Sequence, residues 1–405
     1  MTADEILAQL LTDSARADPY PIYRQLRRLG PIAPLTQEMA GVSRFAAVAT
    51  GYDLIDSVLR DVSFYKQATP GARQHPLLST FDTSMMFTNP PEHTRMRGLF
   101  AKTFTPRRLA AMDPIISAVV DDRLDRMEQA GAGGAVLDYV EEFAAQMPAL
   151  VMAAFIGIPV EDLDWYRARV RPIDAFMDLD GKTPEALQRA DDATEELRGY
   201  YTRLLDQRRR DPQPDLLSAL VASVDAGEHQ LTEAELISNL IVLFNASFVT
   251  TVFLIGSGLP LLLSRPDVTA ALPGNPELAS DCFSEILRCE SPVQFLARSA
   301  PADLELAGVP LAQGEVVLLL VGAGNRDPDR FADPDTFDPG REQLPSLGFG
   351  AGAHYCIGAA VARAEAQIAL PRLFERFPRL ALAGEPVGSH SLFLRGLTSV
   401  PVTLN

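Results

Sequence analysis

The sequence is poor in cysteine, with only Cys282, Cys289 and Cys356. Three cysteines in 405 residues cannot build a disulfide framework, and the acidic start MTADEILAQLL lacks the basic and apolar pattern of a secretion signal or membrane anchor. Positive charge is also scarce: 36 Lys and Arg stand against 53 Asp and Glu, a net charge of −17. This balance argues against a general affinity for nucleic acid or for an anionic membrane surface. We therefore expect a protein of the reducing cytoplasm.

No internal repeat or low-complexity linker interrupts the chain, and its composition is that of an ordinary globular protein. We expect a single domain over residues 1–405. The stretch from Leu236 to Ser264 carries no charge and is long enough to span a bilayer. However, it contains Asn, Ser and Thr residues, has Pro260 near its end and lacks an aromatic belt at its flanks. We therefore expect a helix buried in a soluble protein. The polar residues within this helix then require a structural or functional role.

Apolar residues recur mainly at three- and four-residue spacing, which predicts a mostly helical fold. The predicted helices are Pro21–Leu29, Leu109–Met127, Val136–Phe155, Pro184–Arg208, Leu231–Leu263 and Leu278–Arg288. Thr105 and Thr232 are placed to cap two of these helices. The predicted strands are Phe45–Thr50, Leu304–Leu306, Val316–Val321 and Ser399–Leu404. The Asp- and Pro-rich stretch Gly324–Arg341 is expected to be an irregular ordered loop.

The segment Leu347–Glu365, LGFGAGAHYCIGAAVARAE, places one cysteine in a glycine-rich loop before a helical pattern. Gly350 and Gly352 permit backbone conformations that a Cβ would hinder, and a helix from about Ile357 would stabilise a Cys356 thiolate. Gly358 leaves space beside the sulfur for a flat group. A plain core cysteine is the alternative, whereas a zinc site is disfavoured because Cys282 and Cys289 lie seven residues apart on a predicted helix.

Phe349, Gly350, Gly352, His354, Cys356 and Gly358 match, position for position, the haem-binding signature of the cytochrome P450 family. The sequence therefore resembles this family, from about Asp18 to the C-terminus. The resemblance implies a mostly α fold with a small β region, with haem b (iron protoporphyrin IX) between the long central helix and the helix of the cysteine loop. It makes Cys356 the thiolate ligand of the iron.

Further residues match the family in chain order. Glu285, Arg288 and Arg341 resemble its buried glutamate–arginine–arginine core, although their spacing alone is equally consistent with a surface ion pair. The motif HTRMR places His93 and Arg97 where the family contacts the haem propionates, and Arg298 and His354 occupy further matching positions. The other cations of this region (Arg95, Lys102, Arg107, Arg108) and Arg363 resemble a surface that receives an acidic ferredoxin, although such a run is more often a solvated face.

The uncharged helix resembles the family's oxygen-handling helix, in which an acid precedes a threonine. Here Thr250 matches, but Val249 stands in place of the acid, and valine cannot relay a proton. Ser247 replaces a glycine and could partly compensate, although a serine within a helix more often bonds its own backbone. We name Thr250 and Ser247 as candidate catalytic residues.

Helix phase and the resemblance together predict a mainly apolar substrate pocket, for which plain core is the competing interpretation. The polar members Asn245 and Gln294 are expected to hydrogen bond a polar substrate atom, because a buried amide without a partner costs about 1–3 kcal/mol. The predicted lining residues are Met85, Met86, Val242, Asn245, Ala246, Val293, Gln294, Phe295, Leu296, Leu392 and Phe393.

The resulting hypothesis is a monomeric haem-thiolate monooxygenase that oxidises a small organic molecule, such as an intermediate of secondary metabolism. It would use O₂ and electrons from a ferredoxin and a ferredoxin reductase. Because Val249 replaces the acid, the same haem could instead support coupling, nitration, epoxidation or a peroxide-driven oxidation. A haem protein that senses gas or carries electrons is a third possibility.

Overall fold

The computed structural model describes residues 1–36, 45–67, 72–178, 182–227, 231–342 and 345–404. The chain folds into two compact units. Unit 1 contains Met1–Phe64, Ile116–Pro148 and Val249–Asn405, and unit 2 contains Tyr65–Ile115 and Ala149–Phe248. The long helix α13 (Glu233–Leu263) starts in unit 2 and ends in unit 1. One domain over residues 1–405 stays a prediction.

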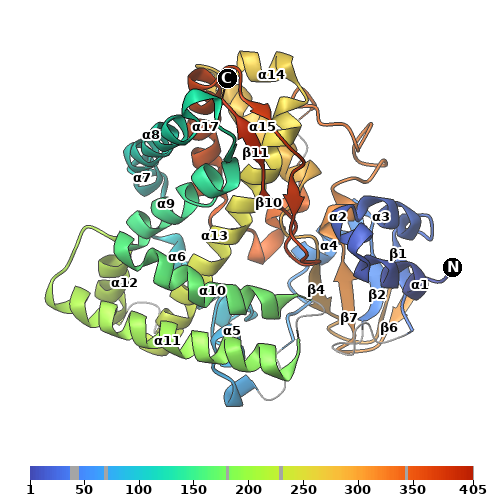
Figure 1. Ribbon diagram of the computed structural model, residues 1–405. Helices are drawn as coiled ribbons and strands as arrows, with labels where there is room; N and C mark the ends of the chain where they lie inside the picture. Colours follow the sequence, from blue (N-terminus) through green and yellow to red (C-terminus); the bar gives the residue numbers. More distant parts are fainter. Residues whose placement is uncertain (37–44, 68–71, 179–181, 228–230, 343–344, 405) are drawn as a thin grey trace. The chain divides into compact units, whose positions relative to one another are not determined.

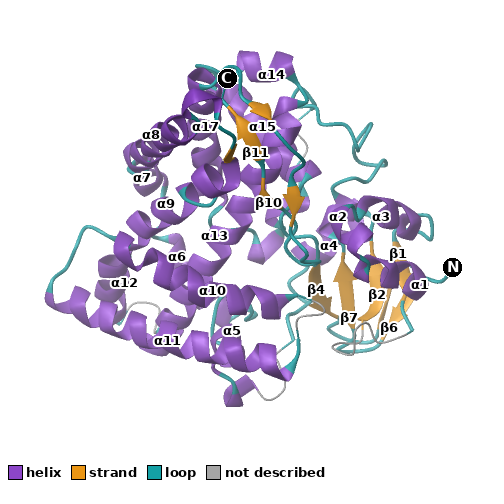
Figure 2. Cartoon of the chain, viewed as in Figure 1, coloured by secondary structure: helices purple, strands orange, loops and turns teal. Residues whose placement is uncertain are grey.

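Unit 1 combines helices with short strands (Figure 1 and Figure 2). In its N-terminal part, α1 contacts α3, and α16 contacts both α3 and α4. In its C-terminal part, α15 contacts α17, the helix that follows the cysteine loop. The helices of this unit are α1 (Ala3–Ala8), α2 (Asp13–Ala17), α3 (Tyr20–Arg27), α4 (Tyr52–Arg60), α8 (Asp113–Ala130, its first residues in unit 2), α14 (Pro266–Ala271), α15 (Pro276–Cys289), α16 (Val321–Gly324) and α17 (Ala359–Arg376).

The main sheet of unit 1 has the strand order β1-β2-β7-β4. Its strands β2 and β7 are parallel, with Val48 opposite Leu318, and the two outer pairs are antiparallel. The alternate residues Ala47, Ala49, Val317 and Leu319 point into a core that also contains Ile55 of α4. The strands of unit 1 are β1 (Ile32–Pro34), β2 (Phe45–Ala49), β3 (Leu137–Asp138), β4 (Leu296–Ser299), β5 (Leu304–Leu306), β6 (Val309–Leu311), β7 (Val316–Leu319), β8 (Ala381–Leu382), β9 (Val387–Gly388), β10 (Leu397–Ser399) and β11 (Pro401–Thr403).

Unit 2 is helical in the part of the chain that the structure describes. Helices α10 and α11 pack against each other, and α11 also contacts α5 and α12. Three aromatic residues, Tyr166, Tyr201 and Phe244, are completely buried in its core, and the two tyrosine hydroxyls lie 2.9 Å apart. The helices are α5 (Pro76–Asp82), α6 (Glu92–Ala101), α7 (Pro106–Ala110), α9 (Met147–Ile156, its first residues in unit 1), α10 (Leu163–Met177), α11 (Pro184–Arg210), α12 (Leu216–Asp225) and the first half of α13.

The expected mostly helical fold with small sheets is confirmed. The predicted start of α13 is correct, because Thr232 and Glu235 form a reciprocal capping box. This helix is the only one in the described ranges that is long and apolar enough to cross a membrane, and 61% of its most apolar window is buried inside the protein.

Three predicted elements differ from the structure. The helix expected over Leu109–Met127 is two helices, because Pro114 is placed to start α8 rather than to continue α7. The helix expected over Val136–Phe155 is wrong at its start: β3 pairs with β11, and a short π-helix (Val140–Ala144) precedes α9. The strand expected over Ser399–Leu404 is split between β10 and β11, and Val400 between them accepts a hydrogen bond from Tyr139.

Candidate functional site

The cysteine loop of unit 1 exposes the side chain of Cys356. The loop contains two short 3₁₀ turns, Leu347–Phe349 and Gly352–His354, and the backbone N–H of Cys356 donates to the carbonyl of Phe349 at 3.0 Å. Helix α17 begins at Ala359, two residues later than expected, with Gly358 as its N-cap. The sulfur therefore lies just before the positive end of an 18-residue helix.

Three glycines shape the space around this sulfur. Gly350 and Gly352 have φ of +67° and +66°, which a residue with a Cβ adopts only with strain. A Cβ on Gly352 would also lie 2.4 Å from the backbone oxygen of Leu59, an atom that cannot easily move. A Cβ on Gly358 would meet only the Cys356 sulfur within 4 Å, at 3.9 Å, in the described part of the chain. The loop therefore keeps open space beside one sulfur.

The glutamate–arginine–arginine group holds α15 to the irregular loop before the cysteine. Arg288 donates to both carboxylate oxygens of Glu285, at 2.7 and 2.8 Å, and Arg341 donates to the same carboxylate at 3.2 Å. Burial alone would raise the pKa of Glu285, but the hydrogen bonds and charge of Arg288 outweigh it and hold this pKa below its ordinary value. Arg288 also donates to the backbone oxygens of Pro334 and Thr336. Because the side chains of Glu285 and Arg288 are buried, the core role, rather than a surface ion pair, fits this group.

Arg298 on β4 is a buried cation, 4% exposed, in unit 1. Within the described chain it forms no ion pair, and its hydrogen bond goes to the backbone oxygen of its neighbour Ala297. Burial lowers the pKa of Arg298 to about 10. A buried guanidinium is normally stabilised by an anion, so this side chain fits a carboxylate supplied by a bound group. His354, the fourth predicted propionate contact, is half-buried at the end of the second 3₁₀ turn.

In unit 2, α6 carries the other predicted anion-binding residues. His93 is 2% exposed, and burial together with the charges of Arg97 and Lys66 lowers its pKa to about 4. These positive charges oppose protonation of the imidazole, and they would attract a carboxylate. The unit therefore holds positive charge around His93, and the propionate contacts of His93 and Arg97 stay a prediction.

The polar residues of α13 have different roles. Asn239 is buried and structural: its Oδ1 accepts from the backbone N–H of Met85 at 2.8 Å, and its Nδ2 donates to the carbonyl of Glu235 at 2.7 Å. The Ser247 hydroxyl donates to the backbone oxygen of Phe244 at 2.8 Å, the local bond that the sequence left as an alternative. Thr250 is half-buried and follows the half-buried Val249.

The predicted substrate-pocket residues fall in both units. In unit 1, two segments of the prediction lie side by side: Val293 bridges to Leu394, and the rings of Phe295 and Phe393 lie 5.3 Å apart. Leu296 is half-buried and Leu392 is buried in the same unit. In unit 2, Met85 and Val242 are buried, Asn245 and Ala246 are half-buried, and Met86 is exposed.

The expectation that Gln294 bonds a substrate atom is wrong. Its Oε1 accepts from the hydroxyl of Tyr23 at 3.0 Å, and its Nε2 donates to the carbonyl of Ser291 at 2.6 Å. The side chain is 1% exposed, and a Cβ on Gly322 would lie 2.3 Å from its Oε1. Gln294 therefore joins α3 to the segment after α15 and has a structural role.

Two of the cations expected on a ferredoxin surface are engaged inside the protein. Arg95 forms a two-point ion pair with Glu235, and Arg363 donates to the hydroxyls of Ser280 and Ser284. Lys102 and Arg108 are exposed. The side chain of Arg107 lies outside the part that the structure describes.

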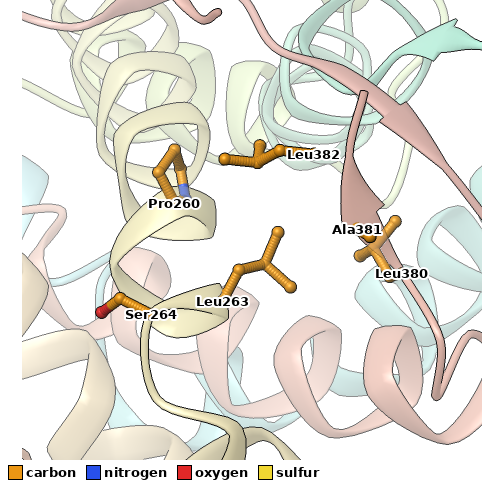
Figure 3. Close-up of a pocket in the computed structure, with 6 residues that line it drawn as sticks. All are labelled: Pro260, Leu263, Ser264, Leu380, Ala381 and Leu382. Atoms are coloured by element: carbon orange, nitrogen blue, oxygen red, sulfur yellow. The ribbon is translucent and has the colours of Figure 1, made fainter. Parts of the chain in front are cut away.

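An apolar hollow of about 360 Å³ occurs in unit 1, beside the C-terminal end of α13 (Figure 3). It contains no titratable side chain, and its single hydroxyl is that of Ser264. The hollow therefore offers no group for acid–base or ligand chemistry and is not the candidate site. It is lined by Pro260, Leu263, Ser264, Leu380, Ala381 and Leu382.

Sequence reasoning missed Asp174 on α10, whose carboxyl interacts with the amide of Asn245. The signal was present in the sequence as an acid between the apolar residues Ile173 and Phe176, both of which are buried. Helix phase could not identify Asn245 as the partner of Asp174, because the two residues lie on different helices.

Comparisons with known proteins agree with this geometry. The family model described as Cytochrome P450 matches residues 38–387. The chain is similar to the cytochrome P450 monooxygenase PikC of Streptomyces venezuelae, with 37% identity over 95% of this chain and 91% of that protein. It is 34% identical to 6-deoxyerythronolide B hydroxylase of Saccharopolyspora erythraea over 98% of each chain. The solved structure of P450BioI in complex with a fatty-acid-ligated acyl carrier protein superposes with a TM-score of 0.88 and 32% identity, covering 97% of this chain and 100% of that one.

Proposed function

Because this chain belongs to the cytochrome P450 family, whose members are haem-containing oxidoreductases, we propose that it oxidises a small organic biosynthetic intermediate with O₂ and electrons from a ferredoxin and its reductase. The observation that carries the proposal is the cysteine loop. It presents one exposed sulfur with open space beside Gly358, and the buried cation Arg298 belongs to the same unit. We propose a cytoplasmic monomer.

The residues present fit haem b. Cys356 would supply the thiolate ligand of the iron, and Phe349, Gly350 and Gly358 would shape the loop around it. Arg298 and His354 of unit 1, and His93 and Arg97 of unit 2, would bind the two propionates, whose charges match the cations described above. The bound haem supplies the activation of O₂, which a thiolate ligand promotes.

The chain's own residues then bind and orient the substrate. Apolar side chains, including Val242 and Phe295, would exclude water from the reacting centre, since a dry site strengthens each polar interaction in it. The Thr250 hydroxyl would form a hydrogen bond beside the reacting centre, where protons must be delivered. Ser247 is less suited to this task, because its hydroxyl already donates to the backbone of its own helix.

A second candidate is an oxidation other than hydroxylation, such as coupling, nitration, epoxidation or a peroxide-driven reaction. Val249 favours it, since the position that carries an acid in related enzymes has no group here that can move a proton. Product analysis with electron donors, and separately with hydrogen peroxide, distinguishes the two reactions. A higher yield with peroxide than with ferredoxin and reductase would favour the second candidate.

The experiment that tests the shared assignment compares Cys356→Ser with wild type and with Cys282→Ser. Thiolate ligation implies a red-shifted absorbance of the reduced carbon-monoxide complex. We expect wild type and Cys282→Ser to show this band and Cys356→Ser to lose it. An unchanged band in Cys356→Ser would refute the ligand assignment.

A further inference from the structure

Helix α10 presents one acid, Asp174, towards α13 within unit 2. The two helices pack through aromatic contacts: the ring of Tyr166 lies 4.3 Å from that of Phe244, and the guanidinium carbon of Arg167 lies 5.3 Å from the ring centre of Phe248. Asp174 follows Arg167 by about two helical turns and so lies on the same side of α10. Its interaction with Asn245 of α13 confirms this placement.

The pair of Asp174 and Asn245 has hydrogen-bond acceptors to spare. The side chain of Asn245 hydrogen bonds to the carboxyl of Asp174, which an amide does through its N–H when the carboxyl is ionised. The Oδ1 of Asn245 is buried and has no hydrogen-bond partner within the described chain. The surroundings thus leave an amide oxygen and a carboxyl group that can both accept a hydrogen bond from a further donor.

No cation of the described chain forms an ion pair with Asp174. On α10, Arg167 lies 3.7 Å from Asp164, and Arg171 is exposed. On α11, which packs against α10, Glu196 pairs with Arg169 and Asp191 with His75. The segment of α13 from Leu236 onward has no charged residue, and Asp178 and Lys182 after α10 are not among the groups that shift Asp174.

The environment of Asp174 has a measurable consequence. Burial raises the pKa of Asp174 to about 7, although the hydrogen bond from Asn245 partly opposes the shift. Water no longer stabilises the ionised carboxyl fully, and no cation among the described residues forms an ion pair that would replace this stabilisation. A bound cation would supply the missing stabilisation.

We propose that Asp174 and Asn245 form a substrate-recognition site for a positively charged, hydrogen-bond-donating group, such as an ammonium or guanidinium carried on an otherwise apolar molecule. This inference rests on the proposed function and names the substrate class of that enzyme. Asn245 lies one helical turn before Val249, on the same face of α13, so the site begins next to the positions assigned to oxygen chemistry. A neutral alcohol would use the acceptors but leave the carboxylate without a counter-charge.

Binding of such a cation must be linked to the ionisation of Asp174. An opposite charge within about 4–6 Å lowers the pKa of a carboxyl group by about 1–3. A pKa lowered by one corresponds to about tenfold tighter binding of the cation to the ionised than to the protonated site. Below pH 7, binding should therefore release a proton, and affinity should rise as the pH increases through 7.

The test compares N-decylguanidinium with N-decylurea, which share the decyl chain and a planar head group but differ in charge, because the urea carries a carbonyl oxygen in place of one NH₂ group. Titration calorimetry of the haem-loaded enzyme at pH 6 and pH 8, in two buffers of different ionisation enthalpy, measures affinity and proton release without turnover. We expect wild type to prefer the guanidinium by about tenfold at pH 8 and by less at pH 6, where proton release appears. Asp174→Asn should remove the preference and the proton release, and Asn245→Leu should weaken both probes.

The matched control is Asp164→Asn, which removes one exposed negative charge from the same helix. Asp164→Asn should retain the preference for the guanidinium over the urea. This result would exclude a general attraction of the acidic protein for cations. Equal affinity of the two probes for wild type, a preference that survives Asp174→Asn, or binding of neither probe would each overturn the inference. The carbon-monoxide band is recorded for each preparation. A normal band with no preference refutes only this inference, whereas loss of the band in wild type refutes the proposed function.

Discussion

The carboxyl group of Glu365 on α17 provides a stability test of the helix that follows Cys356. The side chain is 2% exposed, and its Oε1 has no hydrogen-bond partner in the described ranges. Burial raises the pKa of Glu365 from 4.5 to about 8. At neutral pH the folded protein therefore holds this group mainly in its protonated form, whereas the unfolded chain ionises it. The perturbation is Glu365→Gln, which keeps the shape and removes the titration.

The magnitude follows from the linkage between the pKa and the free energy of unfolding. A raised folded-state pKa gives stability that is fully present below about pH 4.5 and is lost as the pH rises through about 8. A pKa difference of one corresponds to about 1.4 kcal/mol, so the full loss in the free energy of unfolding is on the order of 5 kcal/mol. Because water can enter when the carboxyl ionises, we expect the actual loss to be about 2–5 kcal/mol. The Gln variant lacks this loss but leaves a buried amide partly unbonded, at a pH-independent cost of about 1–3 kcal/mol.

The assay is urea unfolding of the haem-loaded protein at pH 5.5 and pH 8.5. We expect the free energy of unfolding of wild type to fall between these pH values by about 2–4 kcal/mol more than that of Glu365→Gln. The control is Glu375→Gln, an exposed position on the same helix, which should follow wild type because general repulsion among the acids is common to both. Equal pH dependence of wild type and Glu365→Gln would refute the reasoning.

Three further predictions concern the cofactor loop, the oxygen-handling helix and the surface. Gly352→Ala should prevent stable folding or haem retention. Gly227→Ala has a similar positive φ, but no atom of the described chain lies within 4 Å of its added Cβ, so it should cost only about 1–2 kcal/mol in urea unfolding. Similar losses for the two variants would contradict the close approach to Leu59. Val249→Asp should lower the amount of product formed per NADPH, because the new carboxylate would be desolvated, and Thr250→Ala should lower this yield too. A higher yield with Val249→Asp would mean that the enzyme has simply lost a useful proton relay. Arg108→Glu should slow reduction by ferredoxin at low salt and leave substrate binding unchanged; reduction at the wild-type rate would mark Arg108 as part of a solvated face only.

The local features of the sequence predicted the structure best. The glycines around Cys356 act within a few residues, so their consequence could be deduced from spacing, and the capping residues of α13 act within one turn. The three-residue spacing of Glu285 and Arg288 was similarly informative once the resemblance had placed them in the core. In each case the partners are near in sequence, or the family pattern names them.

The failures involve partners that are distant in sequence. The resemblance placed Gln294 among the pocket residues as a buried amide, but it could not show that Tyr23 already bonds this amide. Arg95 belonged to a run of positive charge, and nothing local indicated its pairing with Glu235. Asp174 was overlooked for the same reason, since its meaning depends on Asn245 of another helix.

The division of α13 between two compact units has a consequence for recombining this enzyme with its relatives. A chimera that exchanges unit 2 as one block must exchange two pieces of chain, Tyr65–Ile115 and Ala149–Phe248, and the last junction would fall inside the helix. A crossover there would join half-helices whose side chains were selected with different neighbours. We expect libraries of chimeras to tolerate crossovers after Phe64 better than crossovers at Phe248. We also expect that transferring the substrate range of one relative to another requires the whole of α13.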